Sequence, residues 1–253
     1  MKLFRKKKNN FETGKIVVNE ENNLLSTGGH GRLKDNILYL NADGKNKVIQ
    51  VESSVQSEGK TTAICNLAVS LGLTSKKVVL VDLDFHRPRV HRTLEIEREN
   101  GIAEYMLGSL DKKDIIKKTK YNNVDVITRG AEIYNATLVL MSDKFKDLIK
   151  QLREEYDFVL LDCPPVLQVS DYIHICKISD GVLFLVAYAS TTKAQVSAAI
   201  KELRNNGANI LGTAFTLYDK KKDNSHYASG HYGYGYHYGC HAKDDEEDSI
   251  EKA

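Results

Sequence analysis

Residues 53–62 read SSVQSEGKTT, and this stretch decides the fold. It follows a β-branched run, Val48–Val51, and precedes a stretch whose apolar residues recur at helical spacing from Ile64 to Leu71. A Gly-Lys-Thr turn between a buried strand and an amphipathic helix is the end of the phosphate-binding loop G-x-x-x-x-G-K-[ST], although its first position here is Ser54. The chain is therefore predicted to bind the phosphates of a nucleotide.

The residues of this loop have separate chemical tasks. Gly59 lets the backbone approach the phosphate closely, and the N–H groups at the start of the helix point at the anion. Lys60 can reach the β- and γ-phosphates, and the Thr61 hydroxyl can ligate Mg²⁺. The predicted nucleotide-binding residues are Ser57, Glu58, Gly59, Lys60, Thr61 and Thr62.

Three aspartates end two further apolar strands. VVLVDLD brings Asp82 and Asp84 to the end of one strand, and FVLLDCPP brings Asp162 to the end of another. Because ligands of parallel α/β sheets bind at the carboxyl ends of the strands, all three carboxylates are expected to meet the phosphate-binding loop. Mg²⁺ prefers few protein oxygens and several waters, which suits Thr61 with one or two water-bridged carboxylates.

The rest of the chain indicates an α/β fold. Short apolar runs alternate with amphipathic stretches up to about Tyr218, which predicts a P-loop domain with a mostly parallel sheet and helices on both faces. Helices are expected over Arg32–Leu40, behind an N-cap at Ser142, and from Thr192 to a C-cap at Gly207. The expected strands are Val48–Val51, Val78–Leu83, Val124–Ile127, Phe158–Leu161, Val182–Ala187 and Ile210–Phe215.

The composition of the 253 residues, 42% apolar and 28% charged, is that of a globular protein. The longest apolar run, at 182–189, is far shorter than the roughly 18 residues of a membrane span. The start, MKLFRKKKNN, lacks the apolar segment of a secretory signal, so a cytoplasmic location is expected. The four cysteines form no C-x-x-C pair and are expected to be free thiols.

Three segments are predicted along the chain. Residues 1–30 are a basic and polar arm, and residues 31–218 form the phosphate-binding domain. Residues 219–253 form a flexible tail that places tyrosines among glycines and histidines and then becomes acidic, with five Lys against eight Asp plus Glu in all. A stretch with almost no aliphatic residues cannot bury a core of its own.

These motifs together resemble the bacterial tyrosine kinases (BY-kinases), specifically the stand-alone cytoplasmic kinases of capsule and exopolysaccharide systems in Gram-positive bacteria. That family combines a Walker A loop, a Walker A′ motif of the form hydrophobic-D-x-D-x-R, a Walker B motif ending in D-x-P-P, and a C-terminal tyrosine cluster. Here these read SSVQSEGKT, VVLVDLDFHRP, FVLLDCPP and YGYGYHY, in the same order, over roughly residues 30 to 240.

The resemblance implies an ATP-dependent protein-tyrosine kinase that autophosphorylates its tail and uses Mg²⁺. It implies that Lys60 and Thr61 bind phosphate and Mg²⁺, that Asp84 and Asp162 organise the water shell of the metal, and that Asp82 is the base or orienter for the attacking phenol. A phenol with a pKa near 10 is a weak nucleophile at neutral pH, so such a carboxylate is chemically useful. The implied phosphate acceptors are Tyr227, Tyr232, Tyr234, Tyr236 and Tyr238.

The resemblance also implies partners. In the family, a transmembrane protein of the chain-length-determinant type activates the kinase, which would place this chain at the inner face of the cell membrane. Unphosphorylated tails hold subunits in a ring, phosphorylation releases them, and a cognate tyrosine phosphatase is expected to reverse the modification. No nucleic-acid partner is expected, because the sequence shows no pattern of nucleic-acid binding beyond the N-terminal basic cluster.

The chain departs from the family at four places. Walker A′ has His86 where the arginine usually stands, with Arg87 next, and the proline-rich G-x-x-P-P-N-P segment reads GAEIYNAT at 130–137. Thr216 stands where a late strand often ends in a base-recognising Asn. These departures leave two interpretations open: the protein is a divergent active kinase, or it is a kinase that has lost turnover. The positions of the E-x-x-R-x-x-R ring-contact pattern hold Gly28, Gly31 and Lys34.

Two other functions are possible from the sequence. A ParA/MinD-type ATPase switch carries a signature lysine in its phosphate-binding loop, where this chain has Val55. A metal-binding NTPase chaperone could use a histidine-rich tail, but the spacing is irregular and no guanine-reading N-K-x-D follows the loop. The tail residues concerned are His226, His231, His237, Cys240 and His241.

Overall fold

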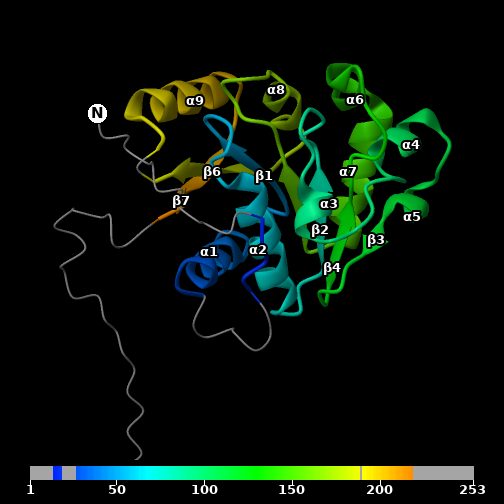
Figure 1. Ribbon diagram of the computed structural model, residues 1–253, viewed down its shortest axis with the longest axis horizontal. Coiled ribbons are helices and arrows are strands. Elements are labelled where there is room, and N and C mark those ends of the chain that lie inside the picture. Colours follow the sequence, from blue (N-terminus) through cyan, green and yellow to red (C-terminus); the bar gives the residue numbers. More distant parts are fainter. Residues whose placement is uncertain (1–13, 19–26, 189, 219–253) are drawn as a thin grey trace, which may run out of the picture. The chain divides into compact units, whose positions relative to one another are not determined.

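The apolar runs of the sequence form one sheet within the residues that the computed structural model describes, namely 14–18, 27–188 and 190–218 (Figure 1). The strand order is β3-β4-β2-β5-β1-β6-β7, and every neighbouring pair is parallel except β3 with β4. The predicted α/β class is confirmed. The strands are β1 Val48–Ser53, β2 Val78–Asp82, β3 Lys117–Lys118, β4 Val124–Ile127, β5 Phe158–Asp162, β6 Gly181–Ala187 and β7 Ile210–Thr216.

Nine helices lie within the described ranges, one before β1 and the others between later strands. The first begins at Thr27, in the glycine-rich stretch that the sequence assigned to the arm, rather than at Arg32. None of the helices in this part of the chain combines the length and the apolarity that a bilayer crossing requires. The helices are α1 Thr27–Leu40, α2 Lys60–Gly72, α3 Val90–Thr93, α4 Ile102–Leu107, α5 Lys112–Ile115, α6 Ala136–Met141, α7 Asp143–Glu155, α8 Tyr172–Ile175 and α9 Lys193–Asn205.

The two longest late helices begin where the sequence predicts, and α9 ends at Asn205 with Asn206 at its C-cap, one residue before the predicted Gly207. The Ser142 side chain caps the start of α7, and the Thr192 side chain caps the start of α9, each accepting a backbone N–H from the first turn. Gly207 follows α9 in the left-handed region, with φ 79°. Glycine is favoured there because it has no Cβ to clash with the preceding carbonyl.

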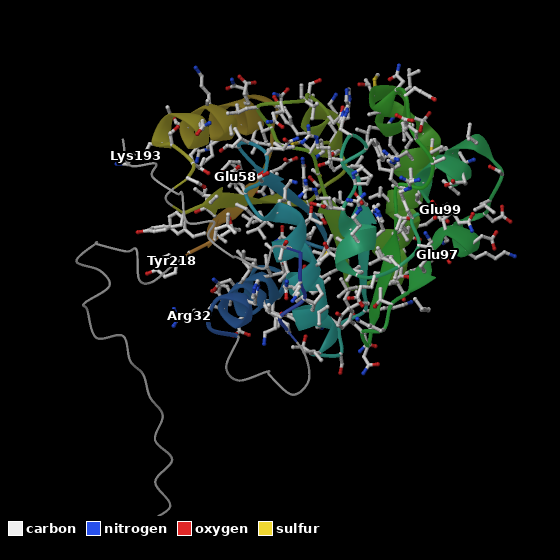
Figure 2. The ribbon with its side chains drawn as sticks, in the orientation of Figure 1. Arg32, Glu58, Glu97, Glu99, Lys193 and Tyr218 are labelled. Atoms are coloured by element: carbon white, nitrogen blue, oxygen red, sulfur yellow. The ribbon has the colours of Figure 1, made fainter. Side chains whose placement is uncertain are left out.

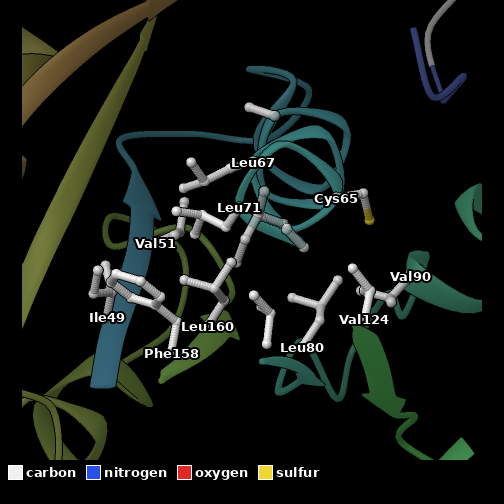
Figure 3. Close-up of a cluster of buried hydrophobic side chains, with 14 of the residues drawn as sticks. Ile49, Val51, Cys65, Leu67, Leu71, Leu80, Val90, Val124, Phe158 and Leu160 are labelled. Atoms are coloured by element: carbon white, nitrogen blue, oxygen red, sulfur yellow. The ribbon is translucent and has the colours of Figure 1, made fainter. Parts of the chain in front are cut away.

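Both faces of the sheet are covered by apolar side chains. Helices α1 to α3 pack on one face, and helices α4 to α9 pack on the other. Figure 3 shows Leu67 and Leu71 of α2 beside Val51, Leu80 and Leu160, which come from three neighbouring strands. Since successive strand residues point to opposite faces and both faces are buried, the central strands read as continuous apolar runs.

A short N-terminal segment, residues 14–18, lies against α2. The buried Asn66 side chain of α2 accepts the backbone N–H of Val17 at 2.8 Å and donates to the Lys15 carbonyl at 3.2 Å. The Gly14 N–H is donated to the Thr62 hydroxyl at 3.2 Å. This part of the predicted arm therefore has a defined place beside the first turn of α2, which the polar sequence did not indicate.

Gly101, which precedes α4, is predicted to be intolerant of any side chain. A Cβ atom there would lie 2.2 Å from the Thr128 carbonyl oxygen and 2.5 Å from the Gly130 nitrogen, both of which are backbone atoms. We expect Gly101→Ala to lower the free energy of unfolding by about 1–3 kcal/mol, measured by urea denaturation. Gly28→Ala is the matched control, because a Cβ there meets open space and alanine favours the helix. Equal denaturation midpoints for the two variants would contradict this prediction.

Candidate active site

The predicted convergence of loop and carboxylates is present at the carboxyl edge of the sheet. Strand β5 lies between β1 and β2, so that Asp162 pairs with Val51 on one side and with Asp82 on the other. The phosphate-binding loop leaves β1 at this same edge and leads into α2 (Figure 1). Strand order alone therefore brings the three motifs together.

Lys60, Thr61 and Asp162 form the centre of the site. The Lys60 ammonium lies 3.6 Å from Oδ1 of Asp162, and the Thr61 hydroxyl donates a hydrogen bond of 2.7 Å to Oδ2 of the same carboxyl group. Burial alone would lower the pKa of Lys60, but nearby carboxylates, Asp162 foremost, raise it above its ordinary value. The lysine therefore keeps its positive charge although its side chain is only 8% exposed.

Asp82 is fully buried next to Asp162. Its Oδ2 accepts the N–H of Val90 at 3.2 Å, whereas its Oδ1 has no hydrogen-bond partner. Burial, followed by the neighbouring charges of Asp162 and Asp84, raises the pKa of Asp82 well above its usual range. The carboxyl group therefore holds a proton more tightly than an ordinary aspartate does.

The carboxyl oxygens of this edge fit a hydrated Mg²⁺ ion. Oδ1 of Asp162 is a buried acceptor without a hydrogen-bond donor. The side chain of Asp84 reaches the lining of the adjacent cavity, beside that of Thr61. A threonine hydroxyl and carboxylates that accept from metal-bound water are the groups that Mg²⁺ takes in phosphate sites. The ion would add positive charge at the phosphates and offset the repulsion among the carboxylates.

A cavity of about 190 Å³ lies over this centre. It is smaller than the roughly 300–1,000 Å³ of a typical ligand pocket, so it suits a phosphate chain rather than a whole nucleotide. All six residues predicted to bind nucleotide line it, together with Asp84, whereas Asp82 and Asp162 are buried behind the lining. The sequence analysis did not assign the further lining residues Gly14, Gln56, Arg89, Thr93 and Pro165.

Glu58 has a structural task that its place in the loop did not reveal. Its carboxylate accepts the Val55 N–H at 2.8 Å and the hydroxyl hydrogen of Thr191. The Glu58 carbonyl accepts from the hydroxyl of Thr216, the residue at the predicted base-recognition position. Figure 2 shows Glu58 close to the start of α2. Both the side chain and the carbonyl of Glu58 therefore brace the loop rather than face a phosphate.

The turn after β2 sends two neighbouring side chains, those of His86 and Arg87, to different partners. Asp84 Oδ1 accepts the backbone N–H of Arg87 at 2.9 Å, which fixes the turn. His86 directs its Nε2 to the buried Asp171 carboxylate, 3.3 Å away. Arg87 instead donates from Nη1 to Oε1 of Gln56 in the phosphate-binding loop, at 2.8 Å. The arginine that meets the loop is therefore residue 87.

The five tail tyrosines and the tail histidines lie outside the described residues. The predicted phosphate acceptors and the metal-binding alternative consequently stay predictions, as does the boundary between the domain and the tail.

Comparison with known proteins identifies the family. A model for an AAA domain matches residues 46–211, from the turn before β1 to the start of β7. Tyrosine-protein kinase YwqD of Bacillus subtilis (strain 168) is 28% identical over 218 residues, which make up 86% of this chain and 91% of YwqD. The chain is an AAA-domain protein of the bacterial tyrosine kinase family.

Solved structures agree with this assignment. The crystal structure of the chimerical protein CapA2B2 matches this chain with a TM-score of 0.76 at 26% identity, over 80% of this chain and 89% of that chain. The septum site-determining protein MinD of Pyrococcus horikoshii OT3, solved with Mg-ADP, matches with a TM-score of 0.57 at 26% identity, over 66% and 68%. The putative tyrosine-protein kinase in cps region of Klebsiella pneumoniae is 26% identical over 194 residues, and the match spans only 27% of that longer protein.

One carboxyl group of this family member was not anticipated from its sequence. Glu52, near the end of β1, is fully buried, and burial raises its pKa to about 8. Its Oε1 accepts from the Gln50 amide at 2.6 Å, and the Gln50 carbonyl accepts from the Ser179 hydroxyl at 3.1 Å. Its Oε2 has no partner. The structure therefore holds Glu52 in its protonated form at neutral pH.

The protonation of Glu52 is predicted to make stability depend on pH. Between about pH 4.5 and 8 the folded chain keeps this proton and the unfolded chain has lost it, so stability falls as the pH rises. Glu52→Gln, which is isosteric with the protonated acid, removes this loss. We expect its advantage in unfolding free energy to grow by up to about 1.4 kcal/mol per pH unit, measured by urea denaturation from pH 5 to 8. An advantage that does not change with pH would refute this assignment.

Proposed function

We propose that this protein is an ATP-dependent protein-tyrosine kinase that phosphorylates tyrosines of its own C-terminal segment and regulates synthesis of a capsular or extracellular polysaccharide. The observation that carries the proposal is the contact of Lys60 and Thr61 with Asp162 at a sheet edge that also holds Asp82 and Asp84. The relatives named as tyrosine-protein kinases support a phosphotransferase. The polysaccharide context comes from the motif resemblance and from a relative named for a cps region.

The chain's own residues supply the chemistry of this proposal. Lys60 and the loop N–H groups bind the phosphates, while Thr61, Asp84 and Asp162 hold the hydrated Mg²⁺. Asp82 accepts the phenolic proton, for which its unpartnered Oδ1 is suited.

The place where β7 ends supports tail phosphorylation. Thr216, the last residue of β7, lies against the phosphate-binding loop, so the chain continues towards the tyrosines from beside the site. Tyr227 is the first of the predicted acceptors, and the segment from Tyr218 to Tyr227 could span about 30 Å when fully extended. A tail of this reach can enter its own site or that of a neighbouring subunit. Self-association through the tail, a transmembrane activator at the inner membrane face and a cognate phosphatase belong to the same proposal.

Mass spectrometry of residues 219–253 after incubation of the full chain with Mg-ATP tests the proposal. We expect phosphotyrosine within Tyr227–Tyr238 in the wild-type protein and a loss of at least about 100-fold in Lys60→Met, which lacks the phosphate-binding charge. Asp82→Asn is expected to lose about 10²- to 10⁴-fold for lack of a proton acceptor. Because asparagine resembles the protonated aspartate in shape, this variant should keep the thermal stability of the wild type.

The alternative function is a ParA/MinD-type ATPase switch, which the MinD match supports at a lower TM-score than the CapA2B2 match. Release of inorganic phosphate from ATP with no phosphotyrosine on the tail would favour the switch and exclude autophosphorylation. Phosphotyrosine of equal amount in the wild-type and Lys60→Met proteins would show that the site described above is not responsible.

A further inference from the structure

Two arginines stand at the rim of the phosphate cavity, in addition to the buried Lys60. Arg87 and Arg89 both line the cavity and both are exposed. Arg87 extends from the turn after β2 to the phosphate-binding loop, where its guanidinium donates to the side-chain carbonyl of Gln56. It therefore closes one side of the cavity by a contact between two motifs that are far apart in the sequence.

The partner of Arg87 leaves its charge available. Gln56 is neutral, so the hydrogen bond of 2.8 Å orients the guanidinium without neutralising it. Lys60, in contrast, already faces the Asp162 carboxylate, and His86 faces Asp171. A guanidinium presents five N–H donors in a planar arrangement that matches phosphate oxygens, and a single contact with Gln56 occupies only part of it.

The turn after β2 aims Arg87 in this direction. Asp84 Oδ1 accepts the Arg87 N–H at 2.9 Å, so the backbone of residue 87 is fixed by a carboxylate whose side chain lines the same cavity. With the backbone held, the side chains of residues 86 and 87 reach partners on different elements. The position of Arg87 is therefore set by the site itself and not by a surface ion pair.

We propose that Arg87 is a catalytic residue whose guanidinium contacts the transferred γ-phosphoryl group, and that Gln56 is the positioning residue that holds it there. This inference rests on the proposed function. In the transfer, a bond forms between the phenolic oxygen and the γ-phosphorus, and the bond from that phosphorus to the bridging oxygen of ADP breaks. The bond's electron pair leaves with ADP, and the phenolic proton passes to Asp82. Arg87 offsets the charge on the equatorial phosphoryl oxygens.

The test compares full-length variants in three measurements: tail phosphorylation, ATP hydrolysis, and binding of Mg-ADP with and without aluminium fluoride, which mimics the planar phosphoryl group. We expect Arg87→Ala to lower kcat at least about 100-fold and to weaken the aluminium fluoride complex by a similar factor. Binding of Mg-ADP alone should change less than about 5-fold, because the contact is made to the γ-phosphoryl group. Arg87→Lys should recover only a minor part of the loss, since an ammonium cannot donate in parallel to two oxygens.

Gln56→Ala separates positioning from direct contact. We expect it to lower kcat by about 10-fold, and the double variant Gln56→Ala/Arg87→Ala to be no slower than Arg87→Ala alone, because Gln56 acts through Arg87. Arg204→Ala is the matched control. This variant removes an exposed arginine side chain from the last turn of α9 and should leave all three measurements unchanged.

Three results would overturn the assignment of Arg87. These are a kcat of Arg87→Ala within about 3-fold of the wild type, an equal loss in His86→Ala, and a loss of Mg-ADP affinity as large as the loss of kcat. A wild-type protein that releases phosphate without forming phosphotyrosine would refute the kinase function instead, and Arg87 would then be judged on hydrolysis. With turnover too slow to measure, an aluminium fluoride complex equally tight in the wild type and Arg87→Ala would refute the role of Arg87.

Discussion

The arrangement of the site depends on one buried carboxyl group, that of Asp162. A carboxylate without a partner is costly to bury. The Asp162 carboxylate has two partners, the Lys60 ammonium and the Thr61 hydroxyl, both from the first turn of α2. The contact joins the end of β5 to the start of the helix that follows β1. It therefore fixes the phosphate-binding loop relative to the strand that separates it from Asp82. Burial raises the pKa of Asp162, although Lys60 and Thr61 act in the opposite direction.

The surroundings of this contact carry an excess of carboxyl groups. Asp82, Asp84 and Glu52 lie close enough to influence its charges, and Asp82 and Glu52 both have raised pKa values because of their burial. Such a cluster disfavours several negative charges at once, so the site retains protons when no ligand is bound. Positive charge that arrives with a nucleotide relieves this repulsion. The same groups that would organise the reaction thus make the folded chain less stable at higher pH in the absence of ligand.

The sequence was sufficient for the parts of the molecule that have strong local signals. The six apolar strands, the Ser142 cap and the meeting of Lys60, Thr61 and Asp162 were predicted from periodicity and from the geometry of parallel sheets. Strand β3 has only two residues, so it shows no periodicity. The first turn of α1 was missed because its glycines have a low helix propensity, and this turn forms because the later turns of α1 pack against α2. The Arg87 contact joins residues whose separation in sequence is 31, and the Glu58 contact with Thr191 joins residues separated by 133, so neither leaves a local pattern.

The loop at the centre of the site is also touched by both outlying parts of the described chain. Gly14 donates to Thr62 and lines the cavity, and Thr216 bonds to the carbonyl of Glu58. An affinity tag or fluorescent protein fused directly before Gly14 or directly after Tyr218 would therefore be attached within a few residues of a contact with the phosphate-binding loop. The position of a fusion therefore affects how the phosphate-binding loop is held, whereas an internal label on α7 or α9 would leave both contacts intact.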